Sequence, residues 1–458
     1  MKDTSEVIIA ERLSKLRNFY ASQQTKPLKF RLEQLRNFKK AILKNQKKIE
    51  AALWADLHKS PEEAFITEIS IVLQEIHMHL KNLKRWARPQ KVITPLPLVP
   101  SSSKIVFEPL GVSLIVAPWN YPFMLLLTPL VGSISAGGCA LLKPSPEAPH
   151  IAQVMEELIA ETFRPEYISL VQGGRETNTI LFKQRYDLIF FTGSPMLGKV
   201  VMKAAAEHLT PVILELGGKS PCIVDADANI NVAAKRIAWG KMINAGQTCI
   251  APDYLLVHES IKNDLLDKIA ANIREMYGET IRESRFYPRI VSERAMKRLK
   301  TLLHSGTIHS GGEVMEEERF ISPTILDHVK SDHPVMQEEI FGPILPALTF
   351  KKIDEAVAYI NTHEKPLAFY YFGKNRNAKE ILRQTTSGGA CINDTLLHIA
   401  NHDLPFGGVG NSGTGKYHGK QSFLVFSNQR SVVTTPTWID LPFKYVPFKY
   451  FGLLKRIL

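Results

Sequence analysis

Residues 111–146 read GVSLIVAPWNYPFMLLLTPLVGSISAGGCALLKPSP, and this stretch decides the fold. A short aliphatic run typical of a buried strand comes first, an apolar segment of helical length follows, and a second apolar run closes the stretch. The uncharged part from residue 119 to residue 142 resembles a membrane span, but Pro129 and the pair Gly137 and Gly138 interrupt it. A crossover helix buried between parallel strands has the same composition, and we adopt that interpretation.

The alternation of strand and helix continues beyond this stretch and predicts an α/β fold with a doubly wound parallel sheet. We expect strands at residues 111–116, 139–142, 167–171, 188–191 and 211–214, and helices at residues 121–137, 150–163, 176–182 and 196–208. Ligands of such sheets bind beyond the carboxyl ends of the strands. Apolar residues at intervals of three and four predict helices in residues 5–85 as well.

Composition narrows the class of protein. The 458 residues are 45% hydrophobic and 22% charged, which allows two or three domains around a large core. The net charge of +12 is accompanied by no RNP, zinc-finger or helix-turn-helix motif, so we expect no nucleic-acid partner. The four cysteines form no CxxC pair, which argues against a disulfide framework and against a metal site. Without a secretory signal, we expect a cytoplasmic protein.

Two reactive residue types lie in residues 212–252, VILELGGKSPCIVDADANINVAAKRIAWGKMINAGQTCIAP. Glu215 is in a β-rich run that two glycines end, and Cys249 lies in a loop between Gly246 and Pro252. Taken alone, a cysteine is most often a buried apolar residue and a glutamate is most often on the surface. A thiol and a carboxylate together suit covalent catalysis, in which a base assists a nucleophile.

A second group of residues suits an anionic cofactor. The segment TGSPMLG, which follows a predicted strand, puts Gly193, Ser194 and Gly198 at a helix N-terminus. Free N–H groups and the helix dipole favour an anion there, although the GxGxxG fingerprint is absent. Lys143 ends another predicted strand at the same edge of the sheet and is suited to bind ribose hydroxyls or a phosphate.

Motifs along nearly the whole chain resemble those of the aldehyde dehydrogenase superfamily. In order they are APWNYP (117–122), LLKPSP (141–146), FTGSPMLG (191–198), LELGGKSP (214–221), GKMINAGQTCIAPDY (240–254), EEIFGP (338–343) and LPFGGVGNSGTGKYHGKQSF (404–423). The short N-terminal part, QTCIAPDY and the last motif are most similar to the class 3 branch, which oxidises medium-to-long aliphatic and aromatic aldehydes.

The resemblance implies the aldehyde dehydrogenase fold, with a Rossmann-like cofactor domain, an α/β catalytic domain and a small β oligomerisation element. The corresponding limits are 1–85 and 104–213 for the cofactor domain, 214–419 for the catalytic domain, 86–103 and 420–437 for the oligomerisation element, and 438–458 for a separate tail. It also implies a small-molecule aldehyde substrate, NAD or NADP as cofactor, and a homodimer.

The resemblance assigns catalytic roles to individual residues. Cys249 is similar to the cysteine that attacks the aldehyde and forms a thioester, and Glu215 to the base that activates the hydrolytic water. Asn120 matches the donor that stabilises the oxyanion. Lys241 matches a class 3 lysine whose role is less certain; without the resemblance it would be interpreted as a helix-surface lysine.

Two further positions concern the cofactor. Glu339 and Phe341 match residues that hold the nicotinamide ribose, although Glu338 and Glu339 by themselves would be interpreted as a surface acid pair. Many NAD-preferring members have a glutamate where this chain has Pro146, and Glu147 is displaced by one position. We therefore hypothesise that NADP is accepted as well as NAD.

Residues 438–458, WIDLPFKYVPFKYFGLLKRIL, form a basic aromatic tail that is too short and too charged to span a bilayer. The pattern consists of Phe443, Tyr445, Phe448, Tyr450, Phe451, Leu453 and Leu454 with Lys444, Lys449, Lys455 and Arg456. It is suited to peripheral contact with a membrane surface. The alternative is a tail packed on the partner subunit or over the mouth of the active site.

Two other functions stay open at this point. An acylating relative would release its product to coenzyme A instead of water, but a hydrolytic base such as Glu215 is superfluous there. A catalytically silent structural protein on the same fold would not need Cys249, Glu215 and Asn120 together. We therefore favour the hydrolytic dehydrogenase.

Overall fold

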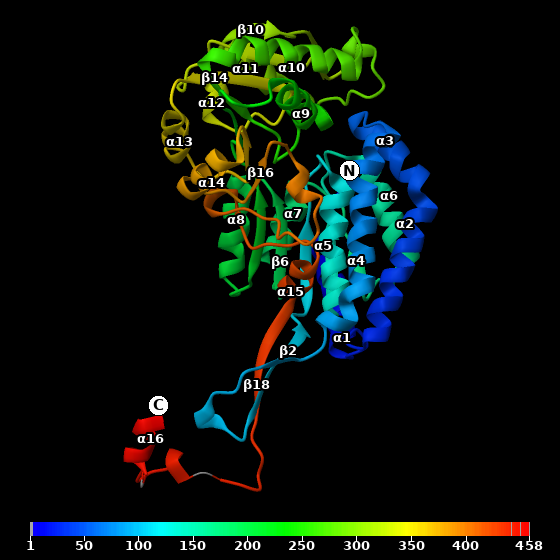
Figure 1. Cartoon of the computed structure of the whole chain (residues 1–458). Coiled ribbons are helices and arrows are strands. Elements are labelled where there is room, and N and C mark those ends of the chain that lie inside the picture. The colour runs from blue at the N-terminus through cyan, green and yellow to red at the C-terminus, as the bar shows by residue number, and fades with distance from the viewer. Residues whose placement is uncertain (1–2, 441, 449, 458) are drawn as a thin grey trace.

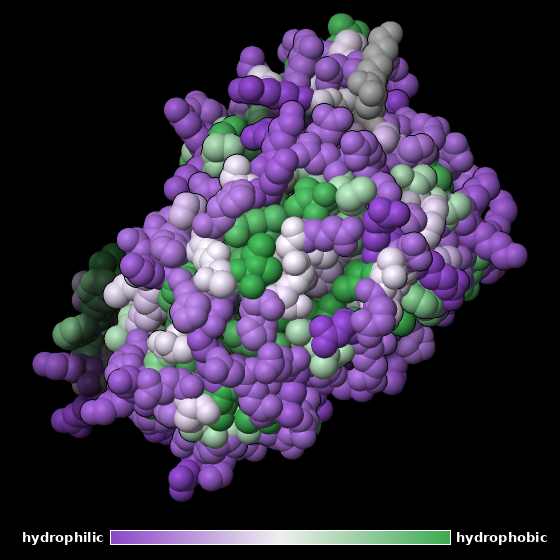
Figure 2. All heavy atoms as spheres, turned by 90° about the horizontal axis from the view of Figure 1, so that it is seen from above, coloured by the Kyte–Doolittle hydropathy of each residue, from purple (hydrophilic) through white to green (hydrophobic). Residues whose placement is uncertain are grey.

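The computed structural model describes residues 3–440, 442–448 and 450–457. Two bodies lie one above the other, and a thin arm leads from the lower body to the C-terminus (Figure 1). The upper body in that view is seen from above in Figure 2, where hydrophilic side chains dominate and apolar ones gather in the middle of the face. Among the described residues, every helix is too short or too polar to cross a membrane.

The N-terminal helices cover one side of the lower body (Figure 1). They are α1 (Glu6–Ala21), α2 (Leu28–Leu57), α3 (Pro61–Ala64), the π-helical turn η1 (Phe65–Ile69) and α4 (Ser70–Trp86). Their buried positions recur at helical spacing, as in Ile9, Leu13 and Leu16 of α1. The prediction of helices in this region is confirmed.

The lower body is built on a six-stranded sheet with the order β17-β7-β6-β3-β4-β5. Its strands are β3 (Val112–Val116), β4 (Cys139–Lys143), β5 (Ile168–Leu170), β6 (Leu188–Gly193), β7 (Val212–Leu216) and the short β17 (Gly413–Thr414). All pairs are parallel except β17 with β7. Four helices connect the parallel strands: α5 (Pro122–Ala136), α6 (Pro149–Thr162), α7 (Arg175–Lys183) and α8 (Pro195–Ala206).

This sheet confirms the doubly wound arrangement that the alternation of elements predicts. The chain winds outward from β3 through β4 to β5, then returns to add β6 and β7 on the other side of β3. The order therefore reverses between β3 and β6, and such a switch point opens a crevice at the strand ends. Every residue of α5 is buried, which explains its uncharged sequence as that of a crossover helix.

The upper body is built on a seven-stranded sheet with the order β10-β13-β14-β9-β8-β15-β16. Its strands are β8 (Pro221–Val224), β9 (Tyr254–His258), β10 (Thr307–Ser310), β13 (Thr324–Asp327), β14 (Ile344–Phe350), β15 (Ala368–Phe372) and β16 (Gly389–Ile392). Only the pair β10 with β13 is antiparallel. The accompanying helices are α9 (Ile230–Met242), α10 (Lys262–Tyr277), α11 (Glu293–Leu302), α12 (Pro334–Gln337), α13 (Ile353–Asn361) and α14 (Asn375–Gln384). The last short helix before the arm, α15 (Lys420–Val425), packs on α5 and α4 of the lower body.

The arm is a three-stranded antiparallel sheet of β1 (Gln90–Val92), β2 (Ser102–Pro109) and β18 (Ser427–Thr434). It joins the two segments expected to form the oligomerisation element, although β2 continues beyond the predicted limit at residue 103. The predicted domain limits themselves stay a prediction. Beyond β18 the tail ends in α16 (Phe451–Ile457), far from both bodies (Figure 1).

The tail residues are only partly described. Lys449 lies outside the described residues, and so do the side chains of Phe443, Leu453 and Leu454. Large apolar side chains among the others are exposed, with Trp438 at 77% and Val446 at 78% of full exposure.

Candidate active site

A cavity of about 270 Å³ opens at the carboxyl ends of β3, β6 and β7, at the switch point of the lower sheet. Its lining residues are Pro118, Trp119, Asn120, Leu125, Thr192, Gly193, Ser194, Glu215, Leu216, Gly217, Cys249, Glu339 and Phe341. The last three come from the upper body, so both bodies form the cavity. The crevice that the doubly wound topology predicts is therefore the place where the predicted residues meet.

Cys249 lies half-buried in this cavity, on the loop after α9. Asn244 and Ala245 have φ angles of 51°, and Gly246 has a φ of 73°, so three successive residues adopt left-handed backbone. A Cβ on Gly246 would lie 2.2 Å from the main-chain oxygen of Gly342, which only a glycine avoids. Left-handed backbone at non-glycine residues is strained and is common at functional sites.

The surroundings of Cys249 favour the protonated form of its thiol. Burial raises the pKa of Cys249 well above its ordinary value, and the carboxyl groups of Glu339 and Glu215 raise it further. Because the thiolate is the nucleophilic form, the cysteine requires a base or a bound cation to become reactive.

Glu215 is in β7 and supplies a carboxyl group in a dry environment. The residue is 3% exposed, and neither oxygen has a hydrogen-bond partner. Burial raises the pKa of Glu215 well above its ordinary value, against a smaller opposite effect of Lys416. A carboxyl whose pKa is raised in this way is, once ionised, a stronger base than an ordinary glutamate, as a general base requires.

Asn120 directs an amide group to the same cavity. Its Nδ2 donates to the main-chain oxygen of Gln247 at 3.0 Å, which leaves the second hydrogen of the amide for another acceptor. Its main-chain oxygen accepts from Asn244 Nδ2 at 2.9 Å and from Lys59 Nζ at 3.1 Å. Hydrogen bonds therefore hold both the side chain and the main chain of Asn120.

The residues expected to hold a cofactor occupy the other side of the cavity. Gly193 ends β6, and Ser194 caps α8 by accepting from Leu197 N at 3.4 Å. Glu339 Oε1 and Thr192 Oγ1 are buried without a hydrogen-bond partner, as expected of groups that bind the hydroxyls of a ligand.

The backbone around Glu339 and Phe341 is shaped to place both side chains in the cavity. A Cβ on Gly217 would lie 2.0 Å from Glu339 Oε2, so this glycine makes room for the carboxylate. Phe341 has a φ of 49°, and its ring meets that of Trp119 edge-on at 5.4 Å between centroids. Burial raises the pKa of Glu339 to about 8. The residues at this side therefore fit a nicotinamide nucleotide.

Three predicted site residues lie outside the cavity lining. Lys143 is buried at the end of β4, where Nζ donates to the main-chain oxygen of Pro144 at 2.7 Å and burial lowers its pKa to about 8. Gly198 faces Leu216, whose side chain would lie 2.8 Å from an added Cβ, so the glycine permits α8 to pack on β7. Lys241 is fully buried in α9, and its Nζ has no hydrogen-bond partner.

Two interpretations based on the residues alone were wrong. Lys241 is not on the helix surface; burial lowers its pKa to about 8, with Asp253 acting in the opposite direction. Glu338 is exposed, but Glu339 turns into the cavity, so the two do not form a surface pair.

Two residues of the motifs GGKSP and IAPDY, which the sequence patterns did not identify as functional, hold the segment around Glu339 in place. Lys219 and Asp253 form an ion pair at 2.5 Å. Lys219 Nζ also donates to the main-chain oxygen of Glu338 at 2.9 Å, and Asp253 Oδ1 accepts from Ile340 N at 3.0 Å. The pair thus holds both neighbours of Glu339. Its contacts join distant segments, and residue spacing carries no signal of such a contact.

Comparisons with known proteins agree with this geometry. The model of the aldehyde dehydrogenase family matches residues 10–432. The chain is 48% identical over 445 residues to 4,4'-diaponeurosporen-aldehyde dehydrogenase of Staphylococcus aureus, with 96% of this chain and 97% of that protein covered. It is 44% identical over 424 residues to the dimeric NADP-preferring aldehyde dehydrogenase of Rattus norvegicus, with 92% and 94% covered.

The fold agrees as well. A solved structure of the substrate-bound state of Staphylococcus aureus AldH matches with a TM-score of 0.96 and 47% identity, over 98% of this chain and 99% of that chain. The family expected from the motifs is thereby confirmed, together with its fold. The chain therefore belongs to the aldehyde dehydrogenase family and is an enzyme that oxidises aldehydes with NAD or NADP.

Proposed function

We propose that this enzyme oxidises medium-to-long aliphatic or aromatic aldehydes to free carboxylic acids, with Cys249 as nucleophile and Glu215 as base. One observation carries the proposal: a thiol, an unpaired buried carboxyl and an amide donor line one cavity. A hydrolytic enzyme needs all three, whereas release to coenzyme A would need no buried base.

In the first step the sulfur of Cys249 bonds to the aldehyde carbon while its proton passes to Glu215. The carbonyl oxygen becomes an oxyanion, which the free N–H of Asn120 and the main-chain N–H of Cys249 stabilise. The negative charge of the Glu215 carboxylate thereby moves to the oxygen of the adduct, where the two N–H groups stabilise it.

Oxidation of the adduct to a thioester removes a hydride, and a nicotinamide nucleotide held in this cavity would supply the acceptor for it. Glu339 and Thr192 have free oxygens to hold ribose hydroxyls, and the N-terminus of α8 at Ser194 suits the pyrophosphate. Glu215 next releases the proton it took from the thiol to solvent. It then takes a proton from water while a C–O bond forms to the acyl carbon, the C–S bond breaks, and Glu215 returns this proton to the leaving thiolate.

NADP is accepted as well as NAD, because Pro146 leaves no carboxylate at the position that repels a 2′-phosphate. Glu147 is exposed, and the relative from Rattus norvegicus is named NADP-preferring. We expect the two kcat/KM values to lie within about a thousandfold of each other, roughly 4 kcal/mol. A larger preference for NAD in steady-state kinetics contradicts this proposal.

The arm supports a homodimer. The connection between β1 and β2 carries exposed apolar side chains, with Ile93 at 94% and Leu96 at 72% of full exposure, and the relative from Rattus norvegicus is named dimeric. Such side chains on a protruding element are suited to cover a second copy of the chain.

We propose a cytoplasmic enzyme whose tail also contacts a membrane surface. Exposed Trp438 and Phe451, at 77% and 60%, accompany basic residues on a segment far from both bodies. Co-sedimentation with anionic liposomes is expected to fall when residues 440–458 are deleted. Unchanged sedimentation rules out the membrane contact and favours packing on the partner subunit or over the active site.

The central experiment follows reduction of NAD and of NADP with decanal and with benzaldehyde, for the intact protein and for Cys249→Ala. We expect reduced cofactor only with the cysteine and without coenzyme A. A reaction that starts only on adding coenzyme A replaces the hydrolytic proposal by the acylating one. No reaction under either condition with these aldehydes contradicts the proposed substrate class.

A further inference from the structure

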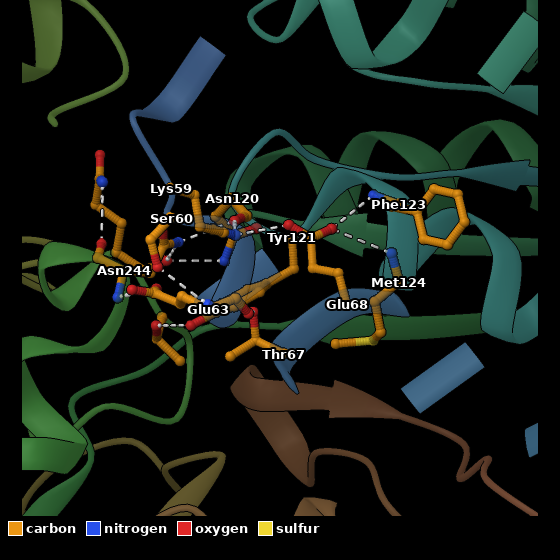
Figure 3. Close-up of polar contacts among 12 residues, drawn as sticks. Lys59, Ser60, Glu63, Thr67, Glu68, Asn120, Tyr121, Phe123, Met124 and Asn244 are labelled. Carbon is orange, nitrogen blue, oxygen red and sulfur yellow. Dashed lines mark hydrogen bonds and ion pairs between the residues drawn. The ribbon is translucent and has the colours of Figure 1, made fainter. Parts of the chain in front are cut away.

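A fully buried ion pair lies behind the oxyanion donor. Lys59 and Glu68 are both 0% exposed, and Lys59 Nζ is 2.6 Å from Glu68 Oε1. Figure 3 shows the two side chains directed toward one another and toward residues 120–124. Removing two charges from water is costly, and a buried ion pair is often no more stable than an apolar pair of the same size. Its presence therefore calls for an explanation other than stability.

The lysine of this pair contacts Asn120 itself. Lys59 Nζ donates to the main-chain oxygen of Asn120 at 3.1 Å and lies 4.3 Å from the ring centroid of Tyr121. Asn244, on the loop of Cys249, donates to the same oxygen at 2.9 Å. The lysine thus fixes the peptide that follows Asn120 (Figure 3).

The glutamate fixes the next turn of the chain. Glu68 Oε2 accepts from Phe123 N at 2.8 Å and from Met124 N at 3.3 Å. These are first-turn amides of α5, and Tyr121 at the N-cap offers no side-chain cap of its own. Glu68 replaces that missing cap from another element, so α5 starts at a fixed place directly after Asn120.

The backbone of the pair is adapted to this contact. Glu68 belongs to the π-helical turn η1 (Phe65–Ile69), between α3 and α4. A π-turn takes up one extra residue and rotates the following side chains relative to an uninterrupted α-helix. Single π-turns are uncommon and occur often at functional sites.

We propose that Lys59 and Glu68 are positioning residues for catalysis, which hold Asn120 in the orientation that presents its free N–H to the oxyanion. This inference rests on the proposed function, because the ion pair acts only by holding Asn120, whose role as donor to the oxyanion is part of that proposal. Neither residue lines the cavity, so neither is expected to contact the aldehyde.

The test replaces the pair by apolar residues of similar size, Lys59→Met with Glu68→Leu. We expect the melting temperature to fall, because Glu68→Leu removes the acceptor of Phe123 N and Met124 N at the start of α5. We therefore compare kcat values well below the melting temperature of the variant. We expect kcat to fall about ten- to a hundredfold, because loss of a whole oxyanion donor costs about a hundred- to thousandfold. KM for NAD and for decanal should change less than kcat.

The decisive comparison uses a double-mutant cycle with Asn120→Ala. If the pair acts through Asn120, the double substitution adds no more than about a threefold loss to the Asn120→Ala enzyme. If the fold-loss in kcat of the pair substitution and that of Asn120→Ala multiply when combined, the proposal is overturned. Full activity of the Lys59→Met, Glu68→Leu enzyme also overturns it. The matched control is Lys262→Met with Asp327→Leu, which removes a partly buried pair of 2.7 Å elsewhere and should keep kcat.

Failure of the proposed function gives different results. If the unmodified enzyme does not oxidise decanal, the proposed function is wrong. If Asn120→Ala retains the kcat of the unmodified enzyme, the role assigned to Asn120 is wrong, whatever the pair does. If the apolar pair does not fold, Glu68→Gln is assayed instead, because it keeps the shape of the side chain and removes its charge. A lower kcat that vanishes in the Asn120→Ala background then supports the proposal, and an unchanged kcat overturns it.

Discussion

At the scale of single residues, the surroundings of Glu215 set the pH response of the enzyme. Burial raises the pKa of this carboxyl, and a base acts only when ionised, so hydrolysis is present above the raised pKa and is lost as pH falls through it. We expect Glu215→Gln to lower kcat about a hundred- to ten-thousandfold and to remove this dependence on pH. A pH–rate profile of both enzymes tests the prediction; a Glu215→Gln enzyme that keeps the original profile contradicts it.

The same carboxyl lowers the stability of the protein. Because the pKa of Glu215 is raised on folding, the folded state holds the proton more tightly, so the contribution of this group to stability is fully present below the ordinary glutamate pKa and is lost as pH rises through the raised value. Gln cannot ionise, so Glu215→Gln should melt at a higher temperature in alkaline buffer, with the difference closing in mild acid. Equal melting temperatures at alkaline pH would contradict this.

At the scale of elements, α4 holds the C-terminal segment through Glu75. This fully buried carboxylate accepts from Gly419 N at 2.9 Å and from Ser422 Oγ at 2.8 Å. It also lies 2.7 Å from His402 Nδ1 and 3.1 Å from His79 Nε2. One side chain therefore joins α4 to the segment that leads to α15.

Loss of this carboxylate is expected to destabilise the protein strongly. Burial alone would raise the pKa of Glu75, but hydrogen bonds with His402 and His79 outweigh it and hold the pKa well below its ordinary value. The stability it contributes is thus present above the ordinary glutamate pKa and is lost only as pH falls toward the lowered one. Glu75→Ala should cost about 3–5 kcal/mol.

Urea unfolding near neutral pH measures this loss. Ser422→Ala is the matched control, since it removes one hydrogen bond to the same carboxylate and should cost about 1 kcal/mol. A Glu75→Ala protein no less stable than this control would show that the segment is held by other contacts.

At the scale of the whole molecule, we expect the arm to form the interface of a homodimer. If its exposed face covers a second copy, Ile93→Asp with Leu96→Asp should halve the mass measured by light scattering, because each charge would have to be buried. Val7→Asp serves as control, since Val7 is 77% exposed on α1 and lies in no part of the arm. A dimer that survives the arm substitutions places the interface elsewhere.

The sequence predicts the lower sheet well and the site partly. Strands such as β3 and β4 are buried on both faces, so an unbroken aliphatic run marks them, and the ends of β6 and β7 locate Gly193 and Glu215. Burial of polar residues is harder to predict. Glu339 and Lys59 are buried by partners far away in the sequence, and periodicity shows only which face of an element is apolar.

The buried crossover helix α5 has a consequence for biosynthesis. Its apolar surface is covered partly by elements that follow it in the chain, such as α15, which a ribosome makes much later. Until then the nascent chain presents an uncharged segment between residues 119 and 142 that resembles a membrane-targeting signal. The order of synthesis thus leaves this apolar segment partly uncovered, and prone to aggregation, before it is part of an enzyme.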